Sequence, residues 1–208
     1  MLIGISGKIG SGKNEVANML SYMLFRKKAG TFEEFQKQQY FRNQYLAYGM
    51  YDRAEDFLPN IHSFANNLKQ CTALCTGIDY HSLENRAQKA SKISWLGLTH
   101  RELLQRFAEA IRCQIDEDFW VKSMLATYQN SEDWIISDLR YENEARALKE
   151  RGAVLVRIHR PRLGYNDHIS EVNLDNYPDF DYHIDNTGDL KDLYNSVQEF
   201  CNFLKDKH

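Results

Sequence analysis

Residues 7–14, with the sequence GKIGSGKN, constrain the fold of this chain more than any other stretch. They follow an apolar run at 2–5 and lead into a helical pattern of apolar residues at 16–20. The stretch matches the phosphate-binding pattern G-x-x-x-x-G-K-[ST] except at its last position, which is Asn14. Glycines allow positive φ, so successive backbone N–H groups can point towards an anion, and the following helix directs its positive end to the same place.

The lysine and the flanking segments favour this interpretation over a chance glycine turn between a strand and a helix. Lys13 supplies a mobile ammonium that can reach the β- and γ-phosphate oxygens of a nucleotide. The strand before the motif and the helix after it are the context in which such loops occur. We therefore predict a nucleoside triphosphate site at residues 7–14.

Composition excludes several classes of protein. With 208 residues, 43% of them hydrophobic, the chain can bury a substantial core, and its net charge of −3 is not typical of a nucleic-acid-binding protein. None of its segments approaches the length of a membrane span. The four cysteines form no C-x-x-C pair, and we expect buried apolar thiols, as at Cys71 and Cys75, in a reducing cytoplasm.

Strand-like and helix-like segments alternate along the chain. We expect short strands at 2–6, 61–64, 134–137, 153–158 and 182–184. We expect helices at 13–26, 65–77, 116–128 and 140–151, one that begins after Thr99 with Glu102 completing a capping box, and a last one capped by Asp189. Residues 78–98 should form an irregular connection, and Leu190 should lie on the apolar side of the last helix. This alternation predicts an α/β fold with a mostly parallel sheet covered on both faces.

Residues 27–60 differ from the rest of the chain because aromatic and charged residues interleave at near-helical spacing. One interpretation is a surface on which bases stack. We favour a helical insertion that packs its aromatic side chains either on the domain or on a second subunit. In the second case the protein would be a homodimer, which is the state we expect.

An apolar strand at 135–137 ends at Asp138, where the turn 138–144 carries further acids and an arginine. A carboxylate at this point of a phosphate-loop protein can hold Mg²⁺, directly or through water, or can bind a substrate or a basic residue. The alternative is an ordinary helix N-terminus enriched in acids. The expected position at the carboxyl edge of the sheet is where α/β proteins bind ligands.

Three arginines, Arg157, Arg160 and Arg162, surround the end of the strand at 153–158. Such a loop can close over a transferring phosphoryl group and stabilise its charge, although a solvated basic turn has the same composition. The chain lacks the N-K-x-D sequence of a GTP-binding switch and is shorter than a typical motor ATPase. These features favour a small-molecule kinase.

Short motifs in a specific order resemble the deoxynucleoside monophosphate kinases of tailed bacteriophages, a family of P-loop nucleotide kinases. The similar stretches are 5–7 with 11–13, 64–69, 101–105, 118–121, 138–145, 152–153, 160–161, 167–171 and 186–193. They span nearly the whole chain apart from 27–60. The resemblance implies a three-layer α/β/α fold formed as a single P-loop kinase domain over 1–208, with a helical insertion at 27–60 and a lid or loop at roughly 160–178.

The resemblance also implies a reaction, ATP + dNMP → ADP + dNDP with Mg²⁺, by in-line transfer under a closing lid. The implied catalytic residues are Lys13, Asp138, Arg140 and Arg160. The implied ATP-binding residues are Gly7, Gly10, Ser11, Gly12, Lys13, Asn14 and Arg162. The implied monophosphate-binding residues are Lys69, Arg101, Gln105, Trp120, Asp138, Arg140 and Glu144. The partners would be small-molecule nucleotides, with neither nucleic acid nor membrane, in the cytoplasm of the host cell if the protein is phage-encoded.

The chain departs from the family pattern at Asn14, where an acid or hydroxyl is common. The amide oxygen of Asn14 can ligate Mg²⁺ or hold its water, but less strongly than a carboxylate. Two alternatives remain beside the leading hypothesis: another small-molecule kinase, such as one acting on dephospho-CoA, and a nucleotide-binding regulator that performs no transfer.

Overall fold

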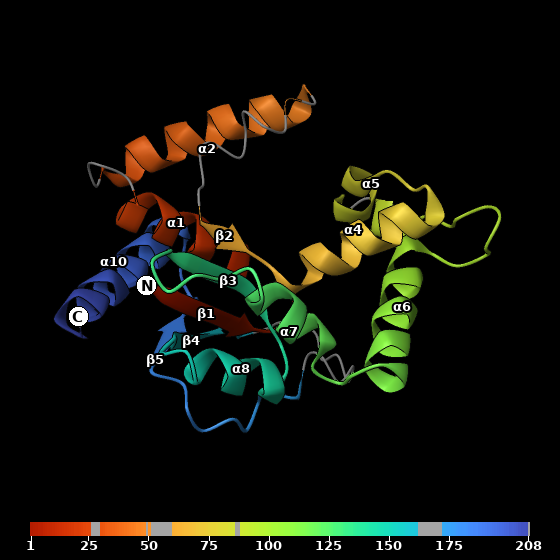
Figure 1. Cartoon of the computed structure of the whole chain (residues 1–208). Coiled ribbons are helices and arrows are strands. Elements are labelled where there is room, and N and C mark those ends of the chain that lie inside the picture. Colours follow the sequence, from red (N-terminus) through yellow and green to blue (C-terminus); the bar gives the residue numbers. More distant parts are fainter. Residues whose placement is uncertain (26–29, 49, 51–59, 86–87, 162–171, 208) are drawn as a thin grey trace. The chain divides into compact units, whose positions relative to one another are not determined.

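A computed structural model describes residues 1–25, 30–48, 50, 60–85, 88–161 and 172–207. These residues contain a five-stranded sheet with the strand order β2-β3-β1-β4-β5, in which every neighbouring pair is parallel (Figure 1). The strands are β1 (Leu2–Gly7), β2 (Ile61–His62), β3 (Trp134–Leu139), β4 (Val154–His159) and β5 (Tyr182–Asp185). The predicted α/β fold with a parallel sheet is confirmed.

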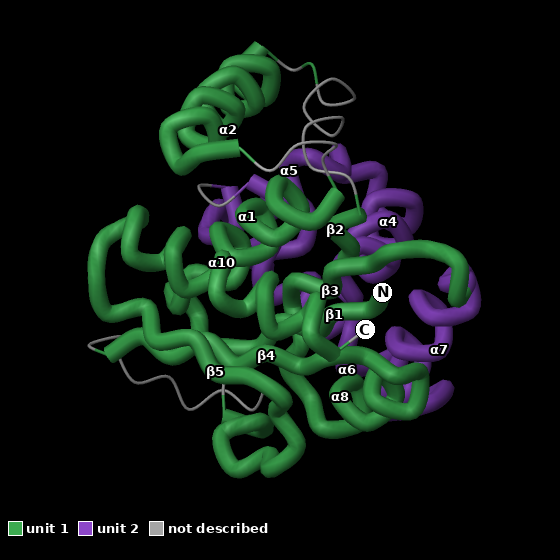
Figure 2. The backbone as a smooth tube through the Cα atoms, turned by 90° about the vertical axis from the view of Figure 1, so that its left-hand side faces the viewer, with its two compact units in different colours: residues 1–62, 130–208 green, residues 63–129 purple. Residues whose placement is uncertain are grey.

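The chain divides into two compact units (Figure 2). Unit 1 comprises 1–62 and 130–208; beside the sheet it contains α1 (Lys13–Phe25), α2 (Phe32–Ala47), α8 (Glu142–Lys149) and α10 (Leu190–Lys207). Unit 2 comprises 63–129; it contains α4 (Phe64–Thr76), α5 (Tyr80–Glu84), the 3₁₀ turn η1 (Gln88–Ala90), α6 (His100–Gln114) and α7 (Phe119–Leu125). That the whole chain works as a single kinase domain stays a prediction.

Unit 1 has three layers because its strands bury apolar side chains on both faces. Ile3 and Ile5 of β1 point into the core formed with α1 and α10, as do Val154 and Val156 of β4. Gly4 lies between Ile3 and Ile5 and faces the opposite side of the sheet. A Cβ added at Gly4 would meet Leu148 of α8. The alternation along β1 therefore explains why helices cover the sheet from both sides.

The strand register determines where a site can form. Ser6 lies beside Leu139 of β3 and beside Arg157 of β4, so these strands finish at the same edge of the sheet. The loop after β1, the turn after β3 and the residues after β4 meet at this edge, which is the usual ligand edge of a parallel α/β sheet.

The two predicted helix N-caps, Thr99 and Asp189, are confirmed. The hydroxyl of Thr99 accepts a hydrogen bond from the N–H of Glu102, and the Glu102 carboxylate accepts one from the N–H of Thr99. Asp189 caps α10 by accepting from the backbone N–H groups of Lys191 and Asp192.

Two local predictions are wrong. The stretch 78–98 was expected to be irregular but contains α5 and η1, because the Asp79 carboxylate accepts from the N–H of Ser82 and starts a short helix. Leu190, expected on the apolar side of the last helix, is 39% exposed because it is the first residue of that helix.

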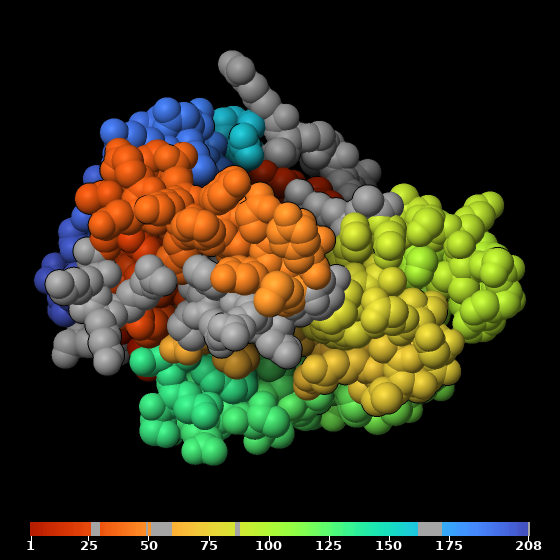
Figure 3. Space-filling model, turned by 90° about the horizontal axis from the view of Figure 1, so that it is seen from above, coloured from red at the N-terminus to blue at the C-terminus, as the bar shows by residue number. Residues whose placement is uncertain are grey.

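Helix α2 lies within the predicted helical segment 27–60. Phe35 in its first half is fully buried and packs against Tyr22 of α1 and Tyr194 of α10. The orange atoms of α2 lie at the surface of unit 1 on the face shown in Figure 3, and the second half of the helix exposes large aromatic side chains. The exposed residues are Tyr40 and Phe41, followed by Tyr48 directly after the end of the helix. A dimer formed through this helix stays a prediction.

The predicted burial of Cys71 and Cys75 is wrong. Helix α4 turns Phe64 and Thr72 inward, so both cysteines fall on its exposed side. Cys113 is also exposed, whereas Cys201 of α10 is buried. Within the described part of the chain, no helix combines the length and apolar character required to cross a membrane.

Candidate active site

The predicted phosphate-binding loop connects β1 directly to α1. The N–H of Ser11 donates a 3.0 Å hydrogen bond to the carbonyl of Lys8, which closes the loop into a turn. The carbonyl of Gly12 accepts from the N–H of Val16 at 3.0 Å and begins α1. Backbone N–H groups and a helix N-terminus therefore occupy one place, an arrangement that attracts anions.

Glycine is required at Gly12 for two reasons. Its φ of 101° lies where side-chain-bearing residues rarely occur, and an added Cβ would lie 2.6 Å from the side-chain nitrogen of Asn186. At Gly7, with φ 156°, an added Cβ would lie 2.8 Å from the carbonyl oxygen of Ile158. The loop is thus packed against β4 and against the segment after β5.

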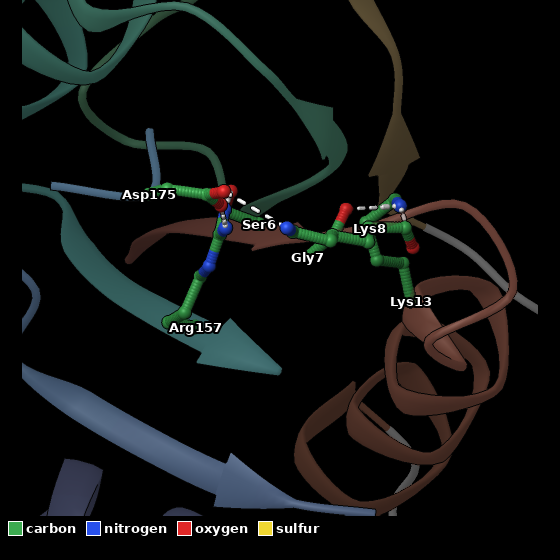
Figure 4. A network of polar contacts seen from close by, with 6 residues as sticks. All are labelled: Ser6, Gly7, Lys8, Lys13, Arg157 and Asp175. Atoms are coloured by element: carbon green, nitrogen blue, oxygen red, sulfur yellow. Dashed lines mark hydrogen bonds and ion pairs between the residues drawn. The ribbon is translucent and has the colours of Figure 1, made fainter. Parts of the chain in front are cut away.

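The ammonium of Lys13 lies inside the loop. Its side chain is 9% exposed, and Nζ donates to the carbonyls of Gly7 and Lys8 at 2.5 and 2.9 Å (Figure 4). The ammonium group that was predicted to bind phosphate is therefore hydrogen-bonded to backbone carbonyls of the same loop.

Two further side chains hold this loop from later parts of the chain. Nη1 of Arg160 donates to the carbonyl of Gly10 at 3.3 Å, so the structure brings this predicted catalytic arginine to the loop. The amide of Asn186, which is 7% exposed, donates to the carbonyl of Ser11 at 2.9 Å. Sequence reasoning included Asn186 in a motif but assigned it no role. Arg162, and with it most of the predicted lid, lies outside the described residues.

The turn between β3 and α8 carries Asp138, Arg140 and Glu144. Glu144 is 3% exposed, and its Oε2 accepts from the backbone N–H groups of Arg140 and Tyr141 at 2.8 and 3.1 Å. This carboxylate therefore caps the start of α8. Asp138 lies near the end of β3 and is partly buried. Contacts of these side chains with nucleotides stay predictions.

Four of the predicted monophosphate-binding residues belong to unit 2, namely Lys69, Arg101, Gln105 and Trp120. Arg101 and Gln105 are one turn apart on α6, and both are exposed. Nζ of Lys69 lies 3.1 Å from Oε1 of Glu84. These three polar side chains belong to unit 2, whereas the phosphate loop, Asp138, Arg140 and Glu144 belong to unit 1.

Trp120 is different because it is 3% exposed and belongs to the packed interior of unit 2. Its indole N–H donates to the carbonyl of Ala108 at 3.2 Å. Trp120 thus joins α7 to α6, and a stacking contact with a base stays a prediction.

Comparison with known proteins adds independent information. Residues 31–197 match the sequence model of the family described as deoxynucleotide monophosphate kinase. The chain belongs to this family. The phosphate loop at 7–14 precedes the matched range, so the loop and the family match are separate observations that agree.

A viral protein supports the same assignment. A protein of Acanthamoeba polyphaga mimivirus with the name "Putative deoxynucleotide monophosphate kinase" is 28% identical over 153 residues, which cover 65% of this chain and 79% of the viral protein. The deoxynucleotide monophosphate kinase family predicted from the sequence motifs is therefore confirmed, and a bacteriophage type stays a prediction.

Kinases of nucleotides use ATP with Mg²⁺, and the residues present fit both groups. The glycines of the loop, together with Lys13, suit the phosphates of ATP, and a Cβ at Gly7 or Gly12 would collide with Ile158 or Asn186 and shift the loop. In the described ranges, no group of three or more His, Cys, Asp or Glu side chains is placed to hold a metal by itself. Magnesium bound to a triphosphate needs only one or two protein oxygens beside phosphate and water, and Asn14 and Asp138 offer such oxygens.

Proposed function

We propose that this chain transfers the terminal phosphoryl group of ATP to a deoxynucleoside 5′-monophosphate and releases ADP and the diphosphate. The observation that carries the proposal is the phosphate loop with Lys13 inside it, in a chain of the deoxynucleotide monophosphate kinase family. The substrates would be free nucleotides of the cytoplasm, in the host cell if the gene is carried by a phage.

The donor half of the site would be built by Gly7, Gly10, Ser11, Gly12 and Lys13. Backbone N–H groups of the loop and the positive end of α1 would bind the phosphates of ATP. Lys13 would exchange its carbonyl partners for phosphate oxygens, and Arg160, held at Gly10, would neutralise charge on the transferring group. Arg162 would act with Arg160 as the site closes.

The acceptor half would be built by unit 2. Lys69 and Arg101 would bind the acceptor phosphate, since ammonium and guanidinium groups form strong charge-assisted hydrogen bonds with phosphate. Gln105 and Trp120 would contact the base, with the buried indole forming part of the wall. Asp138, Arg140 and Glu144 would lie between the two nucleotides.

Transfer would proceed in line. An oxygen of the acceptor monophosphate forms a bond to the γ-phosphorus, and the bond from that phosphorus to the β–γ bridging oxygen breaks, so that ADP leaves with its electron pair. Bound Mg²⁺, held by Asn14 through its amide oxygen or a water and by Asp138, would supply charge neutralisation. The protein's part is to position the two nucleotides and to exclude water.

An ADP-release assay with the purified chain tests the proposal. The four deoxynucleoside monophosphates, the corresponding ribonucleotides and dephospho-CoA are offered separately with ATP and Mg²⁺. We expect turnover with at least one deoxynucleoside monophosphate. Turnover with dephospho-CoA alone would instead assign a CoA-precursor kinase, and ATP binding without any turnover would assign a regulator.

A further inference from the structure

Asp175, which the proposed mechanism does not use, lies between two cations beside the phosphate loop. One carboxylate oxygen is 2.5 Å from Nη2 of Arg157, and the other is 2.8 Å from Nζ of Lys8 (Figure 4). Lys8 is the second residue of the loop, and Arg157 lies on the neighbouring strand β4. The carboxylate therefore joins the loop to the sheet through two ion pairs.

Arg157 transmits this contact to the residue that precedes the loop. Its Nη1 donates a 2.8 Å hydrogen bond to the hydroxyl of Ser6, its direct neighbour in the register of β1 and β4. Ser6 is 1% exposed. The guanidinium also lies over the ring of Phe180, 5.7 Å from its centre. Because Arg157 is held from several sides, it is a firm support for Asp175.

The backbone at Gly7 and Lys8 also binds the side chain of Lys13. The carbonyls of Gly7 and Lys8 accept the hydrogen bonds of the Lys13 ammonium. Any displacement of the backbone at residues 7 and 8 therefore moves the partners of Lys13. Asp175 is connected in this way to the group that would bind the β- and γ-phosphates of ATP.

The segment that carries Asp175 is itself anchored in unit 1. Leu174 is 2% exposed, and the side-chain oxygen of Asn173 accepts a 2.8 Å hydrogen bond from the N–H of Glu142 at the start of α8. The N–H of Asp175 donates to the carbonyl of Val172 at 2.9 Å. The carboxylate thus reaches the loop from a fixed position.

We propose that Asp175 is a positioning residue for ATP: by pairing with both Lys8 and Arg157 it holds residues 6–8 in the conformation that lets the loop bind phosphates. The inference rests on the proposed ATP site. Without the carboxylate, two positive charges would face each other across the start of the loop, and their repulsion would move the loop backbone away from Arg157.

The test compares Asp175→Asn with the wild type by calorimetric titration of ATP and by steady-state kinetics. We expect the Kd and KM for ATP to rise about three- to tenfold, a modest factor because Lys8 and Asp175 are partly exposed. The KM for the deoxynucleoside monophosphate should not change. Asp175→Glu should recover part of the ATP affinity.

Asp181→Asn is the matched control. Asp181 also pairs with two cations, Lys149 at 2.8 Å and Lys207 at 2.7 Å, but it precedes β5, at the edge of the sheet opposite the loop. Its replacement should lower thermal stability and leave the Kd for ATP unchanged. The double variant Asp175→Asn with Lys8→Met should lose no more affinity than the weaker-binding single variant, since both changes remove the same ion pair between Lys8 and Asp175.

Two results would overturn the positioning role. An unchanged Kd for ATP in Asp175→Asn, with a stability loss like that of the control, would make the residue purely structural. A lower Kd would mean that Asp175 keeps Lys8 away from phosphate. Because ATP binding is measured without an acceptor, either result stands even if no deoxynucleoside monophosphate is phosphorylated.

Discussion

The side chain of Asn186 donates a 2.9 Å hydrogen bond to the backbone carbonyl of Ser11, although the two residues are 175 positions apart. The N–H of Asn186 donates in turn to the carbonyl of His159 at the end of β4. The first loop of the chain is therefore held in place by the segment that follows the last strand.

We expect Asn186→Ala to weaken both the fold and ATP binding. The buried carbonyl of Ser11 would lose its partner, which costs about 1–3 kcal/mol of unfolding free energy. Urea unfolding and ATP titration measure the two effects. Asn202→Ala, at an exposed position of α10, is the control and should change neither. Normal ATP affinity in Asn186→Ala would mean that the loop keeps its conformation without this contact.

Lys13→Ala should abolish ATP-dependent transfer. Loss of a cation that stabilises the transition state lowers kcat by about 10²- to 10³-fold. The ADP-release assay measures the change, and circular dichroism verifies the fold. Lys37→Ala, on the exposed side of α2, should retain full activity. Retained turnover of Lys13→Ala in a clean preparation would contradict the phosphate-loop assignment.

Arg101→Ala should raise the KM for the monophosphate far more than the KM for ATP. Charge-assisted hydrogen bonds are worth about 1.5–3 kcal/mol, which corresponds to roughly a 10- to 100-fold change. Arg106→Ala is the matched control because Arg106 is exposed on the same helix but lies on a different side. Equal increases for both substrates would remove Arg101 from the acceptor site.

Asp181 should make stability depend on pH in the acidic range. Burial raises the pKa of its carboxyl, but hydrogen bonds from Lys149, Lys207 and the N–H of Leu155 outweigh burial and lower the pKa below the ordinary 3.8. A lowered pKa in the folded state stabilises the fold above pH 3.8, and this contribution disappears as the pH falls through the folded-state pKa. Thermal unfolding should therefore show Asp181→Asn to be less stable than the wild type at pH 7, with a difference that shrinks on acidification. A constant difference would argue against the ion pairs.

The four cysteines should differ in reactivity towards a thiol reagent. Cys71, Cys75 and Cys113 are exposed, whereas burial raises the pKa of Cys201 to about 12. Because the thiolate is the reactive form, three thiols should react in the folded protein and the fourth only after unfolding. Rapid reaction of all four in the native state would show that α10 opens readily.

Local sequence patterns were sufficient to predict the structural core of the proposed donor site. The glycines and Lys13 indicated a phosphate loop, and Thr99 with Glu102 indicated the start of α6, because these signals act between residues close in sequence. The same reasoning failed for Cys71 and Cys75, since the period of a helix does not reveal which side its neighbours will cover. It also passed over Asp79, whose single cap creates α5.

The sequence alone therefore determined the strand–loop–helix unit at residues 2–25 and the alternation that requires a parallel α/β sheet. Only the tertiary structure decided the strand order β2-β3-β1-β4-β5, and with it the neighbours of the loop. Asn186, Arg160 and Asp175 reach residues 8–11 because distant strands end at one edge of the sheet. Such contacts depend on long-range packing, which no local spacing in the sequence encodes.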